Sequence, residues 1–207
     1  MTHEHDRRFC FDKAARLDDP ERLHRQPPAA VVAALRLAPG SVVLDLGAGT
    51  GFFALPIARA LATAGGDGLV VAADVEPRML ELLAGRARVQ GLGERVATLA
   101  VPGDGLGDWP PALRRPDRAL LANLYHELDD RGAYLARLAQ VLVAGATVLV
   151  VDWDTEGSTE SGPPLAHRVP AATVAAELAA AGFLAVERLP VHDGFHAHRA
   201  RTPGASR

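Results

Sequence analysis

The chain has little cysteine, lysine or aromatic content. Cys10 is the only cysteine among 207 residues, which excludes an internal disulfide and any metal site built from several thiolates. Lys13 is the only lysine while arginine is abundant, a bias that we attribute to the genome. No apolar run approaches the roughly 18 residues of a membrane-spanning helix. Residues 1–8 are polar and do not resemble a signal peptide. We therefore expect a cytoplasmic protein that does not bind membranes.

Charge of neither sign dominates. The 22 Lys and Arg residues and 25 Asp and Glu residues give a net charge of −3, and the basic residues are scattered. A nucleic-acid partner usually requires a clustered basic surface. Residues 123–126 also lack an Asn-Pro-Pro-Tyr type of motif, which is typical of enzymes that methylate bases in nucleic acids. The composition predicts one main globular domain without a nucleic-acid partner. We expect it to act as a monomer or a homodimer.

A glycine-rich stretch follows a short apolar run near the start of the main domain. Residues 42–46 have the apolar, β-branched composition of a buried parallel strand. Gly47, Gly49 and Gly51 follow at alternate positions, so the backbone can turn sharply and approach a ligand closely. Residues 52–61 then carry apolar residues at helical spacing. A strand, a bare loop and a helix N-terminus favour a nucleotide-like ligand with an anionic end.

The spacing of these glycines separates two classes of cofactor. The dinucleotide fingerprint G-x-G-x-x-G places its third glycine at position 52, where this chain has Phe52. The pattern D-x-G-x-G-x-G, from Asp45 to Gly51, instead resembles motif I of the class I S-adenosylmethionine (SAM) methyltransferases. A glycine-rich turn of another α/β protein is the alternative, so the rest of the chain has to decide.

Strand and helix patterns alternate through the remaining sequence. The expected strands are 42–46, 69–74, 96–101, 118–122, 147–152, 183–189 and 194–200, and the expected helices are 29–37, 52–61, 77–89, 129–143 and 170–181. The short connection 190–193 between the last two strands requires an antiparallel hairpin. The sequence therefore predicts an α/β fold: a doubly wound, seven-stranded, mostly parallel, Rossmann-like sheet with a C-terminal antiparallel hairpin, and one antiparallel strand at its end.

This layout strengthens the resemblance, which implies further cofactor contacts. Asp74 ends the second strand, where the family has an acid that accepts hydrogen bonds from both ribose hydroxyls. A helix cap or a turn residue is the alternative. Asp104 matches an acid that binds the adenine amino group, with an Asp-Gly turn as the alternative. The implied SAM-binding residues are Asp45, Gly47, Ala48, Gly49, Gly51, Phe52, Asp74, Val75, Met79, Gly103, Asp104, Gly105, Asn123 and Leu124.

Two segments resemble a group of small bacterial methyltransferases. Residues 17–22 read Leu-Asp-Asp-Pro-Glu-Arg, and residues 162–168 read Gly-Pro-Pro-Leu-Ala-His-Arg. The resemblance implies a SAM-dependent methyltransferase (EC 2.1.1.-) that acts on a small molecule of unassigned structure. The alternatives are a methyltransferase acting on protein or nucleic acid, and a non-catalytic SAM-binding domain. The glycine spacing argues against an NAD(P)-dependent oxidoreductase.

Three residues are candidates for catalytic roles. His126 lies in the segment 121–128 at the end of the fourth strand, which resembles motif IV of the family, and its unperturbed pKa suits a general base. His167 and Arg168 follow the fifth strand, where Arg168 could hold a substrate carboxylate or phosphate. Solvated surface side chains are the alternative. We expect these three residues, with Tyr125 and Trp153, to line one cavity beside the transferred methyl group.

Residues 1–30 are expected to form a helical lid-like segment before the SAM-binding domain, residues 31–207. Asp19, Pro20 and Glu21 have the pattern of a helix start. Because the sulfonium methyl must be shielded from water, we expect this segment and the loop 155–168 at the carboxyl ends of the strands.

Histidines near the C-terminus suggest a metal site. His196 and His198 alternate along an expected strand and therefore share one face. No carboxylate pattern elsewhere in the sequence complements them, and the family that the chain resembles generally needs no metal. We expect no metal site.

Overall fold

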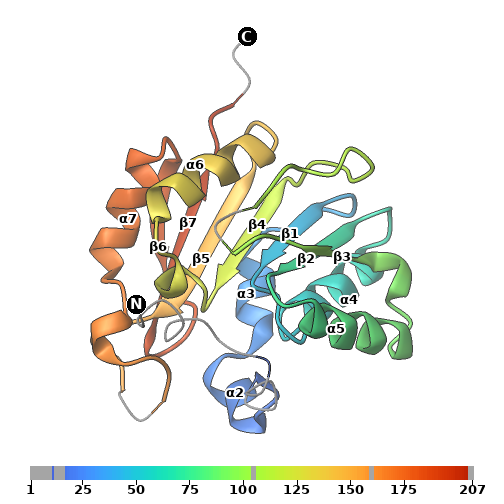
Figure 1. Ribbon diagram of the computed structural model, residues 1–207, viewed down its shortest axis with the longest axis horizontal. Coiled ribbons are helices and arrows are strands. Elements are labelled where there is room, and N and C mark those ends of the chain that lie inside the picture. Colours follow the sequence, from blue (N-terminus) through green and yellow to red (C-terminus); the bar gives the residue numbers. More distant parts are fainter. Residues whose placement is uncertain (1–10, 12–16, 104–105, 159–160, 205–207) are drawn as a thin grey trace.

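The computed structural model describes residues 11, 17–103, 106–158 and 161–204, and their strands form one seven-stranded sheet (Figure 1). The strands are β1 (Val42–Leu46), β2 (Leu69–Asp74), β3 (Val96–Ala100), β4 (Arg118–Ala122), β5 (Thr147–Trp153), β6 (Leu184–Leu189) and β7 (Phe195–Arg201). Their order is β3-β2-β1-β4-β5-β7-β6, with β1 to β5 parallel. The predicted mostly parallel, seven-stranded sheet is confirmed.

The C-terminal hairpin differs from the prediction in its position. β7 pairs antiparallel with both β5 and β6, so the antiparallel strand lies inside the sheet and β6 forms the edge. The burial of the two strands explains this order. Six of the seven residues of β7 are buried, whereas β6 has no fully buried residue. An interior position suits a strand that is covered on both faces, and an edge suits the polar one.

Six α-helices and three short 3₁₀ helices are found in the described part of the chain. They are α2 (Pro20–Arg25), α3 (Pro28–Ala34), α4 (Ala54–Ala64), α5 (Pro77–Val89), α6 (Arg131–Val141), α7 (Ala171–Ala180), η2 (Gly93–Arg95), η3 (Tyr125–Glu127) and η4 (Leu165–His167). α6 begins two residues later than expected because Asp130 caps it, accepting from the Ala133 N–H at 2.9 Å. Among the residues described, no helix is long and apolar enough to cross a membrane.

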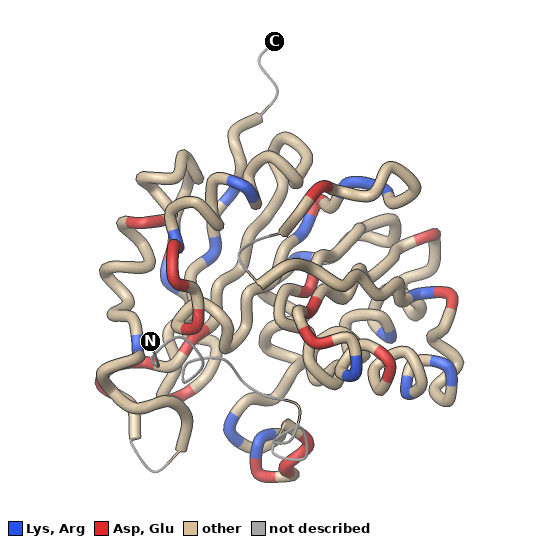
Figure 2. The backbone as a smooth tube through the Cα atoms, viewed as in Figure 1, with Lys and Arg blue, Asp and Glu red and all other residues tan. Residues whose placement is uncertain are grey.

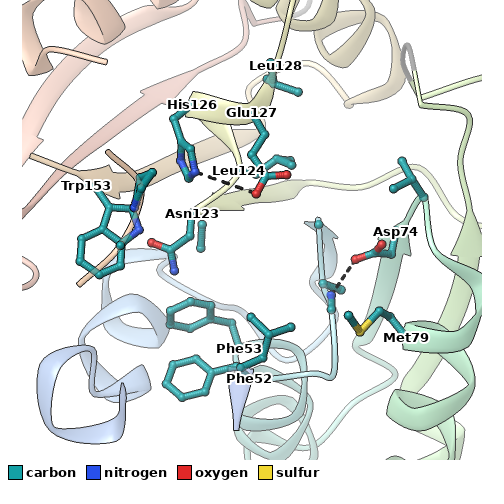
Figure 3. A pocket seen from close by; sticks show the side chains of 18 of the residues that line it. Phe52, Phe53, Asp74, Met79, Asn123, Leu124, His126, Glu127, Leu128 and Trp153 are labelled. Carbon is teal, nitrogen blue, oxygen red and sulfur yellow. Dashed lines mark hydrogen bonds and ion pairs between the residues drawn. The ribbon is translucent and has the colours of Figure 1, made fainter. Parts of the chain in front are cut away.

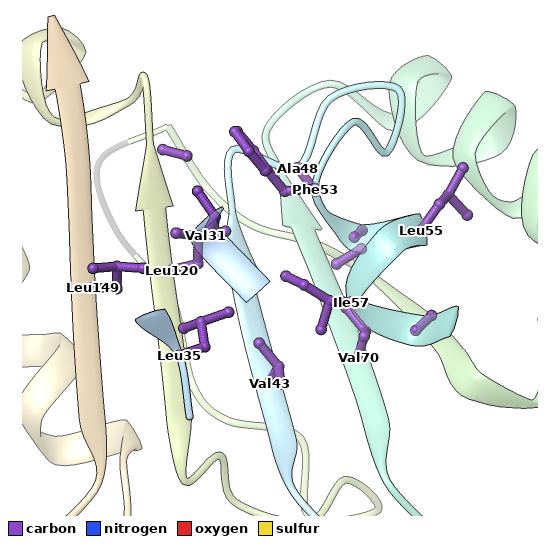
Figure 4. Close-up of a cluster of buried hydrophobic side chains, with 14 of the residues drawn as sticks. Val31, Leu35, Val43, Ala48, Phe53, Leu55, Ile57, Val70, Leu120 and Leu149 are labelled. Atoms are coloured by element: carbon purple, nitrogen blue, oxygen red, sulfur yellow. The ribbon is translucent and has the colours of Figure 1, made fainter. Parts of the chain in front are cut away.

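The helices cover both faces of the sheet, as a doubly wound fold requires. α3, α4 and α5 pack on one face, and Val31, Leu35 and Ile57 contribute fully buried side chains there (Figure 4). α6 and α7 pack on the other face through Leu138 and Leu178. Burying each of these large apolar side chains stabilises the fold by about 1.5–3 kcal/mol. This two-sided core holds the sheet as a rigid platform.

The carboxyl ends of the parallel strands meet at one edge of the sheet. The loops after β1, β2, β4 and β5 emerge there, and α2 lies beside the same edge (Figure 1). α2 is held there by contacts to two of these loops: Asp18 accepts from Thr50 Oγ1 at 2.9 Å, and Gln26 contacts Asn123. The fold therefore brings five separate segments together around one site.

Candidate active site

A cavity of about 1130 Å³ opens at this edge of the sheet (Figure 3). Its walls come from α2, from the loops after the first five strands, and from the segment 161–167. Pockets for drug-sized ligands occupy roughly 300–1,000 Å³. The cavity is therefore large enough for a nucleoside cofactor and a second small molecule side by side.

The glycine-rich loop forms the floor of the cavity because its positions exclude side chains. Gly47 and Gly49 have φ angles of +66° and +52°, which L side chains rarely adopt. A Cβ atom on Gly47 would lie 3.1 Å from Leu124 Cδ1, and one on Gly49 would lie 3.0 Å from Leu17 Cδ1. Both conformation and space therefore favour glycine, which keeps side chains out of the floor of the cavity.

Asp74 connects this loop to the end of β2. Its Oδ2 accepts from the Gly49 N–H at 2.8 Å, and its Oδ1 accepts from the Glu76 N–H at 2.9 Å. Burial raises the pKa of the Asp74 carboxyl, and these N–H groups lower it in part. Glu76, not Asp74, caps α5 by accepting from the Arg78 N–H. Each carboxylate oxygen of Asp74 has a second acceptor site, so the side chain can still bind a ligand.

Asp45 is a second acid in the cavity wall, and it is only 2% exposed. Its Oδ2 atom has no hydrogen-bond partner among the described residues. Burial and the negative charge of Asp74 raise the pKa of this carboxyl to about 7, although the positive charge of Arg22 opposes the rise. A buried acceptor without a partner is costly, so its place in a cavity wall marks a binding position.

His126 and Asp152 form a hydrogen-bonded pair beside the cavity. His126 Nδ1 lies 2.7 Å from Asp152 Oδ1, and the His126 N–H donates to Asp152 Oδ2 at 2.9 Å. Burial lowers the pKa of His126, but Asp152 and Glu127 raise it more, so the pKa lies above its ordinary value. Because an ionised carboxylate only accepts, Nδ1 carries the proton and Nε2 of the neutral ring is an acceptor.

Most of the predicted site residues meet at this cavity. Those that line it are Asp45, Gly47, Ala48, Gly49, Phe52, Asp74, Val75, Met79, Gly103, Asn123, Leu124, His126 and His167, together with Trp153. Gly51 does not line the cavity but faces the helices behind it, where a Cβ atom would be 3.0 Å from both Leu55 Cγ and Leu83 Cγ. Asp104 and Gly105 lie outside the described residues.

Arg168 and Tyr125 do not line the cavity, contrary to the expectation. The Arg168 guanidinium donates at 2.9–3.4 Å to the backbone carbonyls of Asp154, Gly157, Ser158, Ser161 and Pro163. The Tyr125 hydroxyl donates to Glu177 Oε2 at 2.5 Å, beneath the site. With its donors engaged by the loop, Arg168 shapes the cavity from behind and does not reach a substrate.

Two residues of the site were not predicted from the sequence. Arg22 lines the cavity, and Asp152 lies behind His126. Asp152 follows the apolar run of β5, as Asp74 follows that of β2, so an acid near a strand end was the available signal. Arg22 lies within an expected helix, where an arginine normally indicates a solvated face. Only the packing of α2 against the glycine-rich loop places Arg22 in the cavity wall.

The C-terminal histidines are engaged with the core. His196 Nε2 lies 3.0 Å from the Val169 carbonyl, and its ring centroid lies 5.4 Å from that of His198. Within the described residues, no group of three or more His, Cys, Asp or Glu side chains is arranged to hold a metal ion.

Comparison with known proteins identifies the family. A family model described as a methyltransferase domain matches residues 43–145, which contain the glycine-rich loop, Asp74 and His126. A SAM-dependent methyltransferase from Aquifex aeolicus has a similar structure, with a TM-score of 0.82 and 27% identity, covering 94% of this chain and 99% of that one. The chain belongs to the class I SAM-dependent methyltransferase family. The predicted resemblance is thereby confirmed.

Two solved structures of lower sequence identity share the methyltransferase fold. A Planctomyces limnophilus O-methyltransferase family 2 protein in complex with apigenin has a TM-score of 0.68 and 21% identity, covering 98% of this chain and 62% of that one. A [4+2]-cyclase has a TM-score of 0.64 and 20% identity, covering 98% and 86%. Uncharacterised proteins of Mycobacterium tuberculosis and Mycobacterium bovis are 32% identical over 127 residues, 61% of this chain. The matched part spans 42% of the length of these mycobacterial relatives.

Proposed function

We propose that this chain transfers a methyl group from SAM to a small-molecule acceptor. The observation that carries the proposal is the single cavity that joins the cofactor signature to an acid–base pair. Asp74 and the glycine-rich loop line one part of it, and His126, held by Asp152, lines another (Figure 3). A nucleoside cofactor and an acceptor can therefore meet without either having to leave the cavity.

The residues present fit SAM. The close approach required at Gly47 and Gly49, and the buried, unpartnered Oδ2 of Asp45, suit a polar ligand lying on the loop. Asp74 would accept from the ribose hydroxyls, and Met79 and Val75 would border the adenine. When bound, SAM supplies a methyl group already activated by its sulfonium. The protein then has to align the acceptor and exclude water.

His126 is the proposed general base. Asp152 fixes the ring so that Nε2 can take a proton from an acceptor in the cavity. Such a base is useful only for an acceptor that must lose a proton, such as a hydroxyl. An acceptor with a free lone pair would not need it. We therefore expect oxygen acceptors among the substrates.

The acceptor side of the cavity is lined by aromatic and apolar groups. Trp153 and Phe195 lie there with ring centroids 4.4 Å apart, next to Pro163 and Pro164. These walls favour a small, largely apolar acceptor over a polymer. Basic and acidic side chains are interspersed along the described chain (Figure 2), an arrangement that does not favour nucleic acid. Cytoplasmic location and a monomeric or homodimeric state stay predictions.

Calorimetric titration tests the cofactor, and a turnover screen tests the activity. We expect micromolar binding of SAM and S-adenosylhomocysteine and no useful binding of NAD. Methyl transfer is then measured as S-adenosylhomocysteine formed with a panel of phenols, alcohols, amines and carboxylic acids. Tight NAD binding without SAM binding would contradict the proposal. SAM binding without turnover on any acceptor would favour a non-catalytic SAM-binding domain. The similar [4+2]-cyclase is an example of this fold in a protein named for another reaction.

A further inference from the structure

The segment 17–26, which contains α2, is attached to the cofactor loops at several points. Asp18 accepts from Thr50 Oγ1 at 2.9 Å and from Arg86 Nη2 at 2.6 Å. Gln26 is paired with Asn123 in the loop after β4. The segment therefore closes over the glycine-rich loop and the motif IV loop together, and residues on it face the cavity.

Arg22 is a residue of this segment that lines the cavity and stacks on the aromatic rings beside the glycine-rich loop. Its guanidinium carbon lies 3.9 Å from the centroid of the Phe52 ring and 5.8 Å from that of Phe53. Its one hydrogen bond among the described residues goes from Nη1 to the Leu17 carbonyl at 3.2 Å. Stacking on an aromatic face fixes the guanidinium plane and leaves the in-plane N–H donors available.

Arg22 also has no ion-paired anion within the described part of the chain. It forms no salt bridge with any residue that the structure describes. Burial lowers its pKa to about 10, which leaves it charged at neutral pH, and the nearest opposing charges are Asp45 and Asp18. Asp18 is already engaged by Arg86 and Thr50. A half-buried arginine without a paired anion, in a cavity wall, is an anion-binding position.

Asp45 and Arg22 therefore present opposite charges on neighbouring parts of one wall. Among the described residues, the buried Oδ2 of Asp45 has no partner, and the Arg22 guanidinium donates only to the Leu17 carbonyl. An α-amino acid carries an ammonium and a carboxylate on one carbon, so its charges complement such a pair. Of the ligands considered, SAM has this group at the end of its methionine part.

We propose that Arg22 binds the carboxylate of the methionine part of SAM, so that residues 17–26 form a wall of the cofactor site. This inference rests on the proposed function, because it assumes that SAM occupies the cavity. It gives the position of α2 a physical role: the cofactor and the segment stabilise each other, since bound SAM neutralises a charge that has no ion-pair partner among the described residues.

The test compares three ligands by calorimetry: SAM, S-adenosylhomocysteine and 5′-methylthioadenosine, which lacks the amino-acid part. We expect Arg22→Gln to weaken the binding of SAM and of S-adenosylhomocysteine by roughly ten- to a hundredfold, as loss of a charge-assisted hydrogen bond does. Methylthioadenosine should bind as in the wild type. The SAM affinity of Arg22→Lys should lie between those of the wild type and Arg22→Gln, because lysine keeps the charge but loses the planar fork.

Arg59→Gln is the matched control. Arg59 is an exposed residue of α4 that donates to Gln90 Oε1 at 2.6 Å and does not line the cavity. The Arg59→Gln variant should bind all three ligands normally. Equal weakening of all three by Arg22→Gln would overturn the inference, because Arg22 would then only support the fold. Unchanged SAM affinity of this variant would overturn it as well. A raised KM for the acceptor would then indicate that Arg22 binds the acceptor instead. If wild-type protein binds none of the three, the proposed function itself fails.

Discussion

Gln26 and Asn123 exchange both of their side-chain hydrogen bonds across the entrance of the motif IV loop. Gln26 Nε2 donates to Asn123 Oδ1 at 3.1 Å, and Asn123 Nδ2 donates to Gln26 Oε1 at 2.9 Å. Gln26 is 1% exposed, and Asn123 has a φ angle of +57° directly after β4. The pair joins residues 97 positions apart and fixes the segment 17–26 to the sheet.

Gln26→Ala should lower the free energy of unfolding by about 1–3 kcal/mol, because it leaves the Asn123 amide without its partner. Chemical denaturation measures the change. Asn123→Gly keeps the left-handed backbone and serves in a double-mutant cycle with Gln26→Ala. The double variant should be less destabilised than the sum of the two single variants. Strict additivity would show that the two amides are not coupled.

Asp74→Asn should weaken SAM binding by roughly 1.5–3 kcal/mol, the usual range for hydrogen bonds to a charged group. Asparagine keeps one oxygen acceptor and the shape of the side chain, so the fold should survive better than in Asp74→Ala. Calorimetric titration checks the affinity and circular dichroism the fold. Glu76→Gln is the control, because Glu76 caps α5 outside the cavity. An unchanged dissociation constant in Asp74→Asn would place the ribose elsewhere.

Methyl transfer should depend on pH through His126. The pKa of His126 is raised by Asp152, so the neutral, basic form becomes predominant at a higher pH than in an ordinary histidine. Turnover should therefore rise as pH rises through that pKa, and it should be lost at lower pH. Asp152→Asn should shift this acidic limb to lower pH, because the carboxylate that raises the pKa is gone.

His126→Gln should lower turnover by roughly 10²–10⁴-fold, the usual contribution of a general base, while SAM affinity changes little. The pH profile of kcat and a SAM titration separate the two effects. A profile that is flat between pH 5 and pH 8 in the wild type would argue that the acceptor has no proton to lose.

Arg168→Met should loosen the loop after β5. Arg168 holds this loop through its backbone carbonyls, and Gly162, Pro163 and Pro164 of the loop line the cavity. We expect faster limited proteolysis there and a raised KM for the acceptor, with unchanged SAM affinity. Arg188→Met is the control, since Arg188 is exposed and binds only the Asp154 side chain of that region. Equal protease sensitivity of both variants would refute the role of Arg168.

His198 should make the protein less stable in acid. Burial and the positive charge of His196 together lower its pKa to about 4, against an ordinary value of 6.5. Between these two values the unfolded chain binds a proton that the folded chain does not, so stability falls as pH falls through this window. His198→Leu should reduce the loss of melting temperature between pH 7 and pH 5. The exposed His24→Leu should leave it unchanged.

The sequence by itself determined the elements and the cofactor class. Local patterns placed the strands, because apolar runs bounded by glycine and proline depend on neighbouring residues only. Gly47 and Gly49 were recognisable because no other residue suits their backbone, and Asp74 because it ends the strand next to theirs. The order of the terminal hairpin was not accessible, since it depends on which strand the core covers on both faces.

Only the tertiary structure decided which side chains share the cavity. Arg168 was expected at the substrate because of its charge, but the loop engages its donors. Asp152 was seen only as the end of a strand, yet it orients His126 across 26 positions of sequence. Arg22 faces the site because Asp18 and Gln26 fix α2 to the loops. Whether a polar side chain binds a ligand or the chain itself depends on partners distant in sequence, which local patterns do not encode.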